Sequence, residues 1–197
     1  MANSNELILD IDDTLAETAF TAISVMRKKF KHLDPVWEIL AKYEQPGNVP
    51  EWQSIEAKEF LLRTMQSEEF LLNLPRVPDS LEVIEKLSKD FPVQLYMTSR
   101  MPKFESLTKE WLKKNNYPTK NIISIEPSNS DDAWKLKYLI RRGDVNRILI
   151  DNNLNSFGTN IEIYKGKLIW FNRHNKETDL KVISLGTWKS IYDYLRQ

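Results

Sequence analysis

Cysteine is absent from this 197-residue sequence, and histidine occurs only twice, as His32 and His174. Without cysteine the chain has no disulfide bond, no thiolate nucleophile and no thiolate metal site. Neither histidine belongs to a recognisable motif, so we expect ordinary surface or core positions for both. Any catalytic chemistry must therefore come from other side chains.

Net charge and long apolar runs are lacking as well. The 28 Lys and Arg residues balance the 28 Asp and Glu residues, so no global basic field attracts a nucleic-acid polymer. A small basic patch at 28–31 is explained more simply by a solvated helix face. No apolar run approaches the roughly 18 residues of a transmembrane helix, and segment 1–6 lacks the features of a signal peptide. We expect a cytoplasmic protein without membrane or nucleic-acid partners.

Apolar residues are plentiful enough for a substantial core, at 41% of the sequence. The length suits one domain, or one core with a modest insertion. Strands alternating with helices predict an α/β fold with a Rossmann-like, doubly wound parallel sheet. The predicted strands lie at 7–9, 93–97, 121–126, 147–150 and 167–171.

Residues 16–78 interrupt this alternation with helical patterns only. Ile23, Met26 and Phe30 recur at the spacing of an amphipathic helix, and further helices are expected to start at Pro35 and Ser54. We predict an all-helical cap inserted after the first strand, with 1–15 and 79–197 forming the core domain and 16–78 the cap. Beyond the cap, Asp79 and Glu82 are typical of a capping box at a helix start, and Thr187 is expected to cap the last helix.

Acidic residues follow the first predicted strand directly, in the stretch Asp10-Ile11-Asp12-Asp13-Thr14. Asp10 and Asp12 lie two residues apart, so in an extended backbone both side chains leave on the same face. The two carboxylates repel each other, and a fold accepts this where a cation or a reaction needs both. The simpler alternative is an acidic turn in which Asp13 or Thr14 caps a helix.

Two further polar residues end predicted strands of the same sheet. Thr98 follows the strand at 93–97, and Asp151 follows the strand at 147–150. Ligand sites of doubly wound sheets lie at the carboxyl ends of the strands, so these side chains should gather with Asp10 and Asp12. Each of the two could instead simply cap the turn that follows it.

The motif Asp-x-Asp-x-Thr after an apolar strand, with the later motifs in order, resembles the haloacid-dehalogenase-like phosphatases over nearly the whole chain. The resemblance implies that Asp10 attacks phosphorus and that Asp12 passes protons to and from the ester oxygen. It also implies that Thr98, with the neighbouring Ser99, binds a phosphoryl oxygen and that Asp151 is an acidic metal ligand.

The remaining motif of that family is a lysine near a helix start. Lys135 and Lys137 both qualify, and Lys135 is favoured because it lies earlier in the helix and four residues before the core residue Leu139. Both lysines could equally be solvated, as helical lysines usually are.

The resemblance also implies a magnesium site made of Asp10, Asp151 and the backbone carbonyl of Asp12. Such a hard, all-oxygen ligand set suits Mg²⁺, which keeps several of its waters. Asn152 stands where the family often has a second acid, so we expect weaker Mg²⁺ binding rather than its loss.

The function implied is a Mg²⁺-dependent phosphate monoester hydrolase that forms an aspartyl-phosphate. The helical insert and the segment 70–75 resemble 5′(3′)-deoxyribonucleotidase-like members, so a nucleoside monophosphate is the first predicted substrate. Another small ester, such as a sugar phosphate, is the second. A binding module that kept the motifs without turnover is the rival from a different class, and Asn152 favours it. The oligomeric state stays open, a homodimer included.

In those nucleotidases, aromatic residues of the cap sandwich the base. Phe20, Trp37, Trp52 and Phe70 are available here, although filling the cap core is the simpler role for each. Arg100 directly follows the second motif and is predicted to reach the phosphate, a surface position being equally compatible with the sequence.

Overall fold

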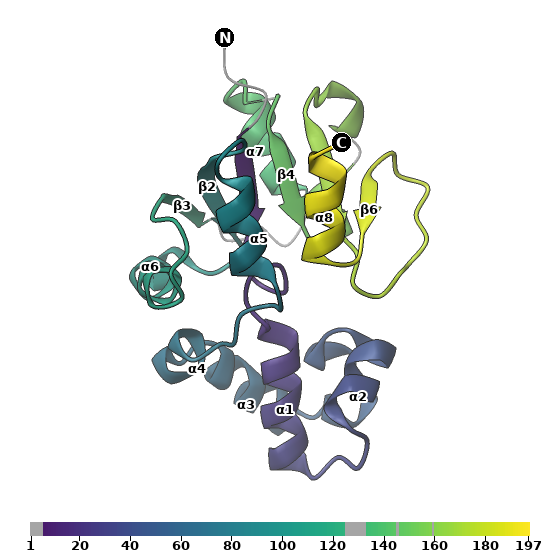
Figure 1. Ribbon diagram of the computed structural model, residues 1–197. Helices are drawn as coiled ribbons and strands as arrows, with labels where there is room; N and C mark the ends of the chain where they lie inside the picture. The colour runs from purple at the N-terminus through teal and green to yellow at the C-terminus, as the bar shows by residue number, and fades with distance from the viewer. Residues whose placement is uncertain (1–5, 125–132, 145, 159) are drawn as a thin grey trace.

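One parallel sheet organises the chain, and the computed structural model describes residues 6–124, 133–144, 146–158 and 160–197 (Figure 1). Six strands lie in the order β3-β2-β1-β4-β5-β6, and every pair is parallel. The strands are β1 (Leu7–Asp10), β2 (Val93–Thr98), β3 (Asn121–Ser124), β4 (Ile148–Asp151), β5 (Lys167–Phe171) and β6 (Ile183–Leu185). The strand order changes direction at β1, which makes the sheet doubly wound.

The predicted fold class is therefore confirmed. The strand prediction missed only β6, a three-residue edge strand that is at most partly buried. Positions 125 and 126 of the predicted third strand lie outside the described residues. Among the described residues, no helix is long and apolar enough to cross a lipid bilayer.

Helices cover both faces of the sheet. The α-helices are α1 (Thr18–Phe30), α2 (Val36–Tyr43), α3 (Ile55–Met65), α4 (Glu68–Leu72), α5 (Ser80–Leu87), α6 (Glu105–Lys114), α7 (Trp134–Arg141) and α8 (Trp188–Leu195). Short 3-10 helices lie at Pro46–Asn48, Pro50–Trp52, Pro102–Phe104, Leu154–Ser156 and Asn160–Ile163. In Figure 1, α5 and α8 pack on one face of the sheet and α7 on the other.

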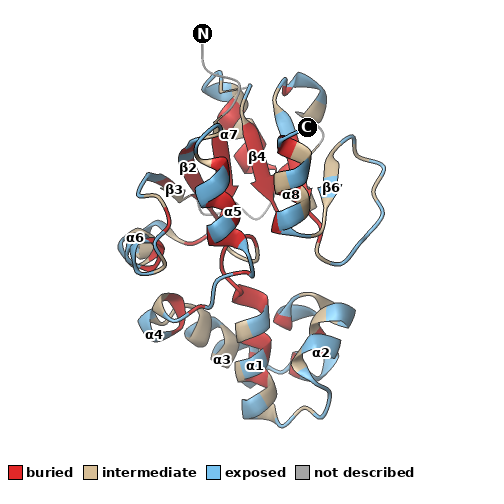
Figure 2. Cartoon of the chain, viewed as in Figure 1, coloured by how far each residue is buried: buried red, intermediate tan, exposed pale blue. Residues whose placement is uncertain are grey.

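The two-residue period of β1 explains this layering. Leu7 and Leu9 pack in the core cluster shared with α5, α6 and α8, whereas Ile8 packs with Leu136 and Leu139 of α7. The three apolar residues of β1 are fully buried, because a parallel strand covered by helices on both faces needs apolar side chains on both. Figure 2 shows β4, which pairs with β1, in red as well.

Helices α1 to α4 form a separate layer that lies against the carboxyl end of β1 (Figure 1). This layer has its own small core, in which Ile23 and Met26 of α1 pack with Ile39 and Trp52. Phe70 and Leu71 of α4 belong instead to the large core cluster of the sheet. The helices therefore occur where a cap was predicted, while the domain limits stay a prediction.

Helix starts at Ser54 and Thr187 follow the predicted chemistry. The Ser54 hydroxyl accepts a hydrogen bond from the N–H of Ala57 at 3.2 Å, and Thr187 forms a capping box with Ser190. The capping box predicted at Asp79 is wrong. Asp79 has a left-handed backbone with φ 62° and makes no side-chain cap, because the chain enters α5 through a turn in which Ser80 donates to the carbonyl of Val77.

Candidate active site

The carboxyl ends of β1, β2 and β4 bring the predicted residues together. Asp10, Thr98 and Asp151 are the last residues of these adjacent strands, and each is at most 4% exposed. Lys135 enters from the first turn of α7 and is 2% exposed. A sheet edge that buries two carboxylates and an ammonium needs those charges to be paired.

Lys135 pairs both of these carboxylates. Its Nζ donates to Asp10 Oδ1 and, at 2.6 Å, to Asp151 Oδ2. Lys137 contacts neither carboxylate, so the structure places Lys135 in the predicted position. Burial by itself lowers the pKa of Lys135, but the charges of Asp10 and Asp151 outweigh burial and keep that pKa above its ordinary value. Burial also raises the pKa of Asp10, against the opposing charge of Lys135.

Asp12 has a different cationic partner. Arg100 Nε lies 3.0 Å from Asp12 Oδ2, and Arg100 Nη2 lies 2.8 Å from Asp12 Oδ1. The hydroxyls of Thr18 and Thr98 also donate to this carboxylate, at 2.6 and 3.3 Å. Burial alone would raise the pKa of Asp12, but Arg100 and the two hydroxyls outweigh it and hold that pKa below its ordinary value. Arg100 therefore contacts Asp12 in this structure.

Thr14 completes the surroundings of Asp10. Its hydroxyl donates to Asp10 Oδ2 at 3.1 Å and accepts from the N–H of Asn152 at 3.2 Å. The side-chain oxygen of Asn152 lies 3.4 Å from the same hydroxyl. Neither Thr14, considered only as a helix cap, nor Thr18 was predicted to contact the acids, although the threonine of Asp-x-Asp-x-Thr was a signal for the first.

The simpler capping roles are also present. Asp13 Oδ1 accepts from the N–H of Ala19 at 2.7 Å, at the start of α1. Thr98 Oγ1 accepts from the N–H of Arg100 at 3.1 Å, and Asp151 Oδ1 accepts from the N–H of Asn153 at 2.8 Å. These caps fix the strand-end turns, so capping and gathering at one site coexist in the same side chains.

A cavity of about 740 Å³ opens over this group, between the sheet and the helical layer. Asp10, Asp12, Ser99, Arg100 and Lys135 line its sheet side. The opposite side is lined mainly by apolar side chains of the helical layer, namely Leu40, Leu62, Met65, Phe70 and Leu71. The residues of the sheet side and Asp151 thus face a space large enough for a small-molecule ligand, whereas Thr98, predicted to bind a phosphoryl oxygen, is fully buried and does not line it.

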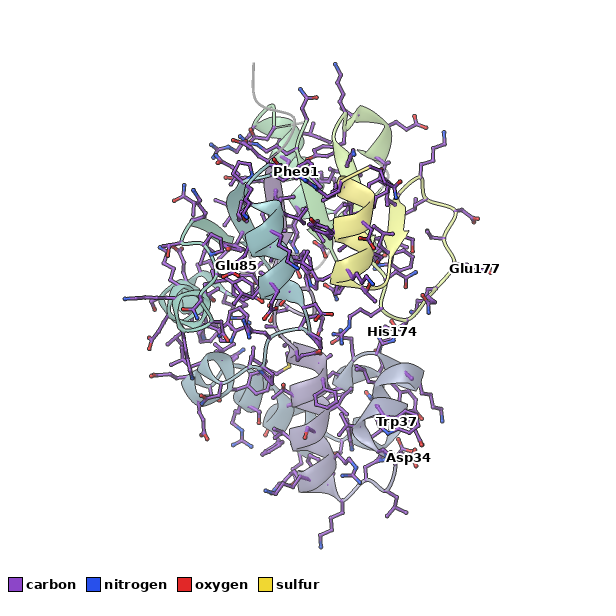
Figure 3. The ribbon with its side chains drawn as sticks, viewed as in Figure 1. Asp34, Trp37, Glu85, Phe91, His174 and Glu177 are labelled. Atoms are coloured by element: carbon purple, nitrogen blue, oxygen red, sulfur yellow. The ribbon has the colours of Figure 1, made fainter. Side chains whose placement is uncertain are left out.

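Of the four predicted cap aromatics, only Phe70 lines this cavity. Phe20 and Trp37 are 40% and 64% exposed and do not line it, and Trp52 is 2% exposed inside the cap core. The spacing of apolar residues along a helix does not show which of them faces a cavity and which faces solvent. Figure 3 shows Trp37 on the side of the helical layer away from the sheet.

The loop after β5 forms the rim of the cavity and was not predicted to take part. Arg173 makes a two-pronged ion pair with Glu17, with both contacts at 2.8 Å. Lys176 pairs with Glu44 at the end of α2. His174 lies between Arg173 and Lys176 in the sequence. It also lines the cavity, on the part of the core that approaches α2 (Figure 3).

Glu44 has an unusual backbone. Its φ of 63° and ψ of −39°, with the N–H of Gln45 donating to the carbonyl of Tyr43 at 2.7 Å, describe a γ-turn of the rare, strained kind. The next side chain, Gln45, donates to Asp13 Oδ2 at 3.3 Å. This strained turn therefore presents two consecutive side chains to the core.

The donor chemistry fits a magnesium ion. Among the described residues, no group of three or more His, Cys, Asp or Glu side chains converges as a metal cluster. Asp10 and Asp151 are two carboxylates that lie within reach of one ammonium, and Mg²⁺ is typically held by one or two carboxylates with water and phosphate. Burial first, and then the charges of Asp151 and Asp12, raise the pKa of Asp10 in spite of Lys135.

Comparisons with known proteins show the fold. No family model and no curated protein matches the sequence. Solved structures that do match include a candidate phosphatase from Clostridium difficile, with 16% identity, a TM-score of 0.64, and coverage of 99% of this chain and 100% of that chain. The candidate HAD-hydrolase YfnB from Bacillus subtilis, bound to magnesium, matches with 14% identity, a TM-score of 0.63 and coverage of 98% and 99%. A dehalogenase matches with 12% identity, a TM-score of 0.62 and coverage of 100% and 99%. The fold is therefore that of the haloacid-dehalogenase-like hydrolases.

Proposed function

We propose that this chain is a phosphate monoester hydrolase in which Asp10 is the nucleophile. One observation carries the proposal: Asp10 and Asp12, two residues apart, face one cavity while each has its own buried cation, Lys135 or Arg100. Two carboxylates with separate partners can take separate roles, one as nucleophile and one as acid and base. The candidate phosphatase of the same fold supports this assignment.

The reaction has two steps. Asp10 attacks phosphorus, the ester P–O bond breaks, and the leaving oxygen takes a proton from Asp12. A water then attacks the phosphorus of the aspartyl-phosphate and gives its proton to Asp12, and the bond from phosphorus to Asp10 breaks, which releases phosphate. The incoming phosphoryl charge beside Asp12 raises the pKa of that carboxyl and so favours the protonated form that the first step needs.

Magnesium would be held by Asp10, Asp151 and the backbone carbonyl of Asp12, and when bound it neutralises phosphoryl charge. The chain's own residues complete that neutralisation. Lys135 supplies a fixed ammonium beside Asp10, and Ser99, the proposed contact of a phosphoryl oxygen, lines the same cavity. Asn152 contributes no charge, so the metal relies on fewer acids than in relatives with two.

The substrate we propose is a nucleoside monophosphate. Support comes from the apolar wall of the cavity opposite the carboxylates, in which Phe70, Leu71 and Met65 offer a surface for a planar base. A sugar phosphate is the second choice, and it would make less use of that wall.

Phosphate release from nucleoside monophosphates and sugar phosphates, assayed with Mg²⁺ and with EDTA, tests the proposal. Asp10→Asn should remove turnover while the circular dichroism spectrum stays unchanged, and Asp12→Asn should slow hydrolysis by about two to four decades. Turnover by a folded Asp10→Asn variant would reject Asp10 as nucleophile. Halide release from haloacids without phosphate release would make the chain a dehalogenase, and no turnover of any ester would favour the binding module.

A further inference from the structure

The carboxylate of Asp12 is held from several directions at once. Arg100 contacts both of its oxygens through two different nitrogens, Thr18 of α1 donates at 2.6 Å, and Thr98 of β2 donates at 3.3 Å. A planar guanidinium on a planar carboxylate fixes the rotation of that carboxylate as well as its place. Three neighbours, Arg100, Thr18 and Thr98, therefore fix the orientation of the Asp12 carboxylate.

Arg100 is itself fixed from behind. Its Nη1 donates to Thr108 Oγ1 of α6 at 3.3 Å, and its backbone N–H donates to Thr98. The Arg100 side chain is 6% exposed, whereas the Asp12 side chain that it contacts is 29% exposed. Arg100 and Asp12 both line the cavity, so the more exposed carboxylate is open to the ligand space while the guanidinium holds it.

We propose that Arg100 is a positioning residue for Asp12, an inference that rests on the proposed function. The guanidinium holds both carboxylate oxygens and so fixes the carboxylate in the orientation from which it gives its proton to the leaving oxygen. Lysine cannot replace this role, because an ammonium on a flexible stem is a point charge and does not form the two-pronged contact.

The alternative is that Arg100 leaves Asp12 and binds the phosphoryl group directly. The two roles differ in what a variant loses. A misplaced Asp12 donates its proton poorly, which matters for an alcohol leaving group and hardly at all for a nitrophenolate, which leaves without a proton. A lost phosphate ligand weakens every ester and also weakens inhibition by inorganic phosphate.

The experiment compares Arg100→Met and Arg100→Lys with the unmodified chain on a series of esters, from p-nitrophenyl phosphate to an alkyl phosphate, with Mg²⁺. We expect kcat/KM for the alkyl ester to fall about 100-fold in both variants, and kcat/KM for p-nitrophenyl phosphate to change by no more than about threefold, because kcat/KM depends on the step that cleaves the ester. kcat itself should fall for both esters wherever hydrolysis of the aspartyl-phosphate, which also uses Asp12, limits turnover. The inhibition constant of inorganic phosphate should stay the same.

Arg147→Met is the matched control. Arg147 is also a partly buried arginine with two ion pairs, to Glu6 at 2.7 Å and Asp144 at 2.8 Å, but it precedes β4 at the opposite end of the sheet. Its loss should alter the esters equally if it alters them at all. Thr108→Val removes the contact behind Arg100 and should give the same ester dependence with a smaller loss, which keeps the test open should Arg100→Met unfold.

Several outcomes overturn the inference. An equal loss of kcat/KM on all esters in the Arg100 variants, with unchanged phosphate inhibition, would mean a general structural defect, and weaker inhibition by inorganic phosphate would mean direct phosphate binding. Full activity of Arg100→Lys would show that the two-pronged contact is not needed. Inactivity of the unmodified chain on every ester would instead overturn the proposed function, and this inference with it.

Discussion

Asp13 lies between the two proposed catalytic acids and connects them to the helical layer. Its backbone is left-handed, with φ 59°, a conformation that Asp tolerates better than most residues. One carboxylate oxygen caps α1 through Ala19, and the other accepts from Gln45. Burial raises the pKa of Asp13 to about 6, against the N–H of Ala19, which lowers it. The same residue thus turns the chain away from the site and contributes a carboxyl that takes up a proton more readily than an ordinary aspartate.

We expect Asp13→Asn to remove one pH dependence of stability. A carboxyl whose pKa is raised in the folded state contributes stability that is complete below about pH 4 and is lost as the pH rises through about 6. Asparagine keeps the acceptor for Ala19 without the charge, so the variant should be more stable than the unmodified chain by about 1–3 kcal/mol near neutral pH. Urea unfolding at about pH 4 and pH 8 measures this, and equal pH dependence in both proteins would contradict it.

Lys135→Met should destabilise the folded chain, in contrast to the gain in stability expected for Asp13→Asn. It leaves the carboxylates of Asp10 and Asp151 buried without their ammonium, which should lower the free energy of unfolding by about 3–5 kcal/mol near pH 8. The loss should be smaller near pH 5, where the buried carboxyls can take up protons. Lys137→Met on the same helix is the comparison, since that residue contacts neither carboxylate. A similar loss in both variants would reduce Lys135 to an ordinary helix lysine.

At the level of elements, the strands and the polar residues that end them were predictable, because an apolar run bounded by polar residues is a local signal. The gathering of the strand-end acids was predictable because parallel strands end at one edge, whereas the lysine was predicted from the family resemblance, which left Lys135 and Lys137 open. The γ-turn at Glu44 and the ion pairs of the loop after β5 were not predictable. The ion pairs depend on how Arg173 meets Glu17 and Lys176 meets Glu44, residues that are far apart in the sequence. The failed capping box at Asp79 shows the converse, a correct local pattern overridden by the turn that precedes it.

The loop after β5 should hold the helical layer near the sheet. Arg173→Met combined with Lys176→Met removes the ion pairs to Glu17 and Glu44, which join the two. Partly exposed ion pairs are worth about 0–1 kcal/mol each, so we expect amide exchange in α2 and the 45–53 segment to speed up by roughly fivefold, without change in β1 and β4.

Hydrogen–deuterium exchange at low and high salt measures that change. High salt should speed exchange of α2 in the unmodified chain and have less effect in the double variant, because its ion pairs are already gone. Arg142→Met is the control. It removes an exposed ion pair to Asp144 that lies after α7 and away from the helical layer, and it should leave exchange in α2 unchanged. Faster exchange throughout the sheet would mean general destabilisation, and no change in α2 would mean that the loop does not hold it.

For the molecule as a whole, the site is an accumulation of negative charge that folding alone does not neutralise. Asp10, Asp12, Asp13 and Asp151 all line one cavity. The buried Lys135 contacts Asp10 and Asp151, and the buried Arg100 contacts Asp12. A divalent cation that binds only the folded chain must therefore stabilise the whole molecule. This links a local ligand set to a global observable, the melting temperature.

Mg²⁺ should raise that melting temperature. At a concentration about 100 times its dissociation constant, an ion bound only by the folded state adds about 2.7 kcal/mol, and each kcal/mol is worth roughly 2–4 °C for a chain of this size. Asp151→Asn should abolish the shift, because it removes one of two carboxylate ligands. Asn152→Asp should enlarge the shift at low Mg²⁺, since it adds a carboxylate where the asparagine oxygen now lies beside Thr14. An unchanged melting temperature in Mg²⁺, together with calorimetric titrations without heat of binding, would reject the metal site and leave Lys135 as the sole counter-charge of Asp10 and Asp151.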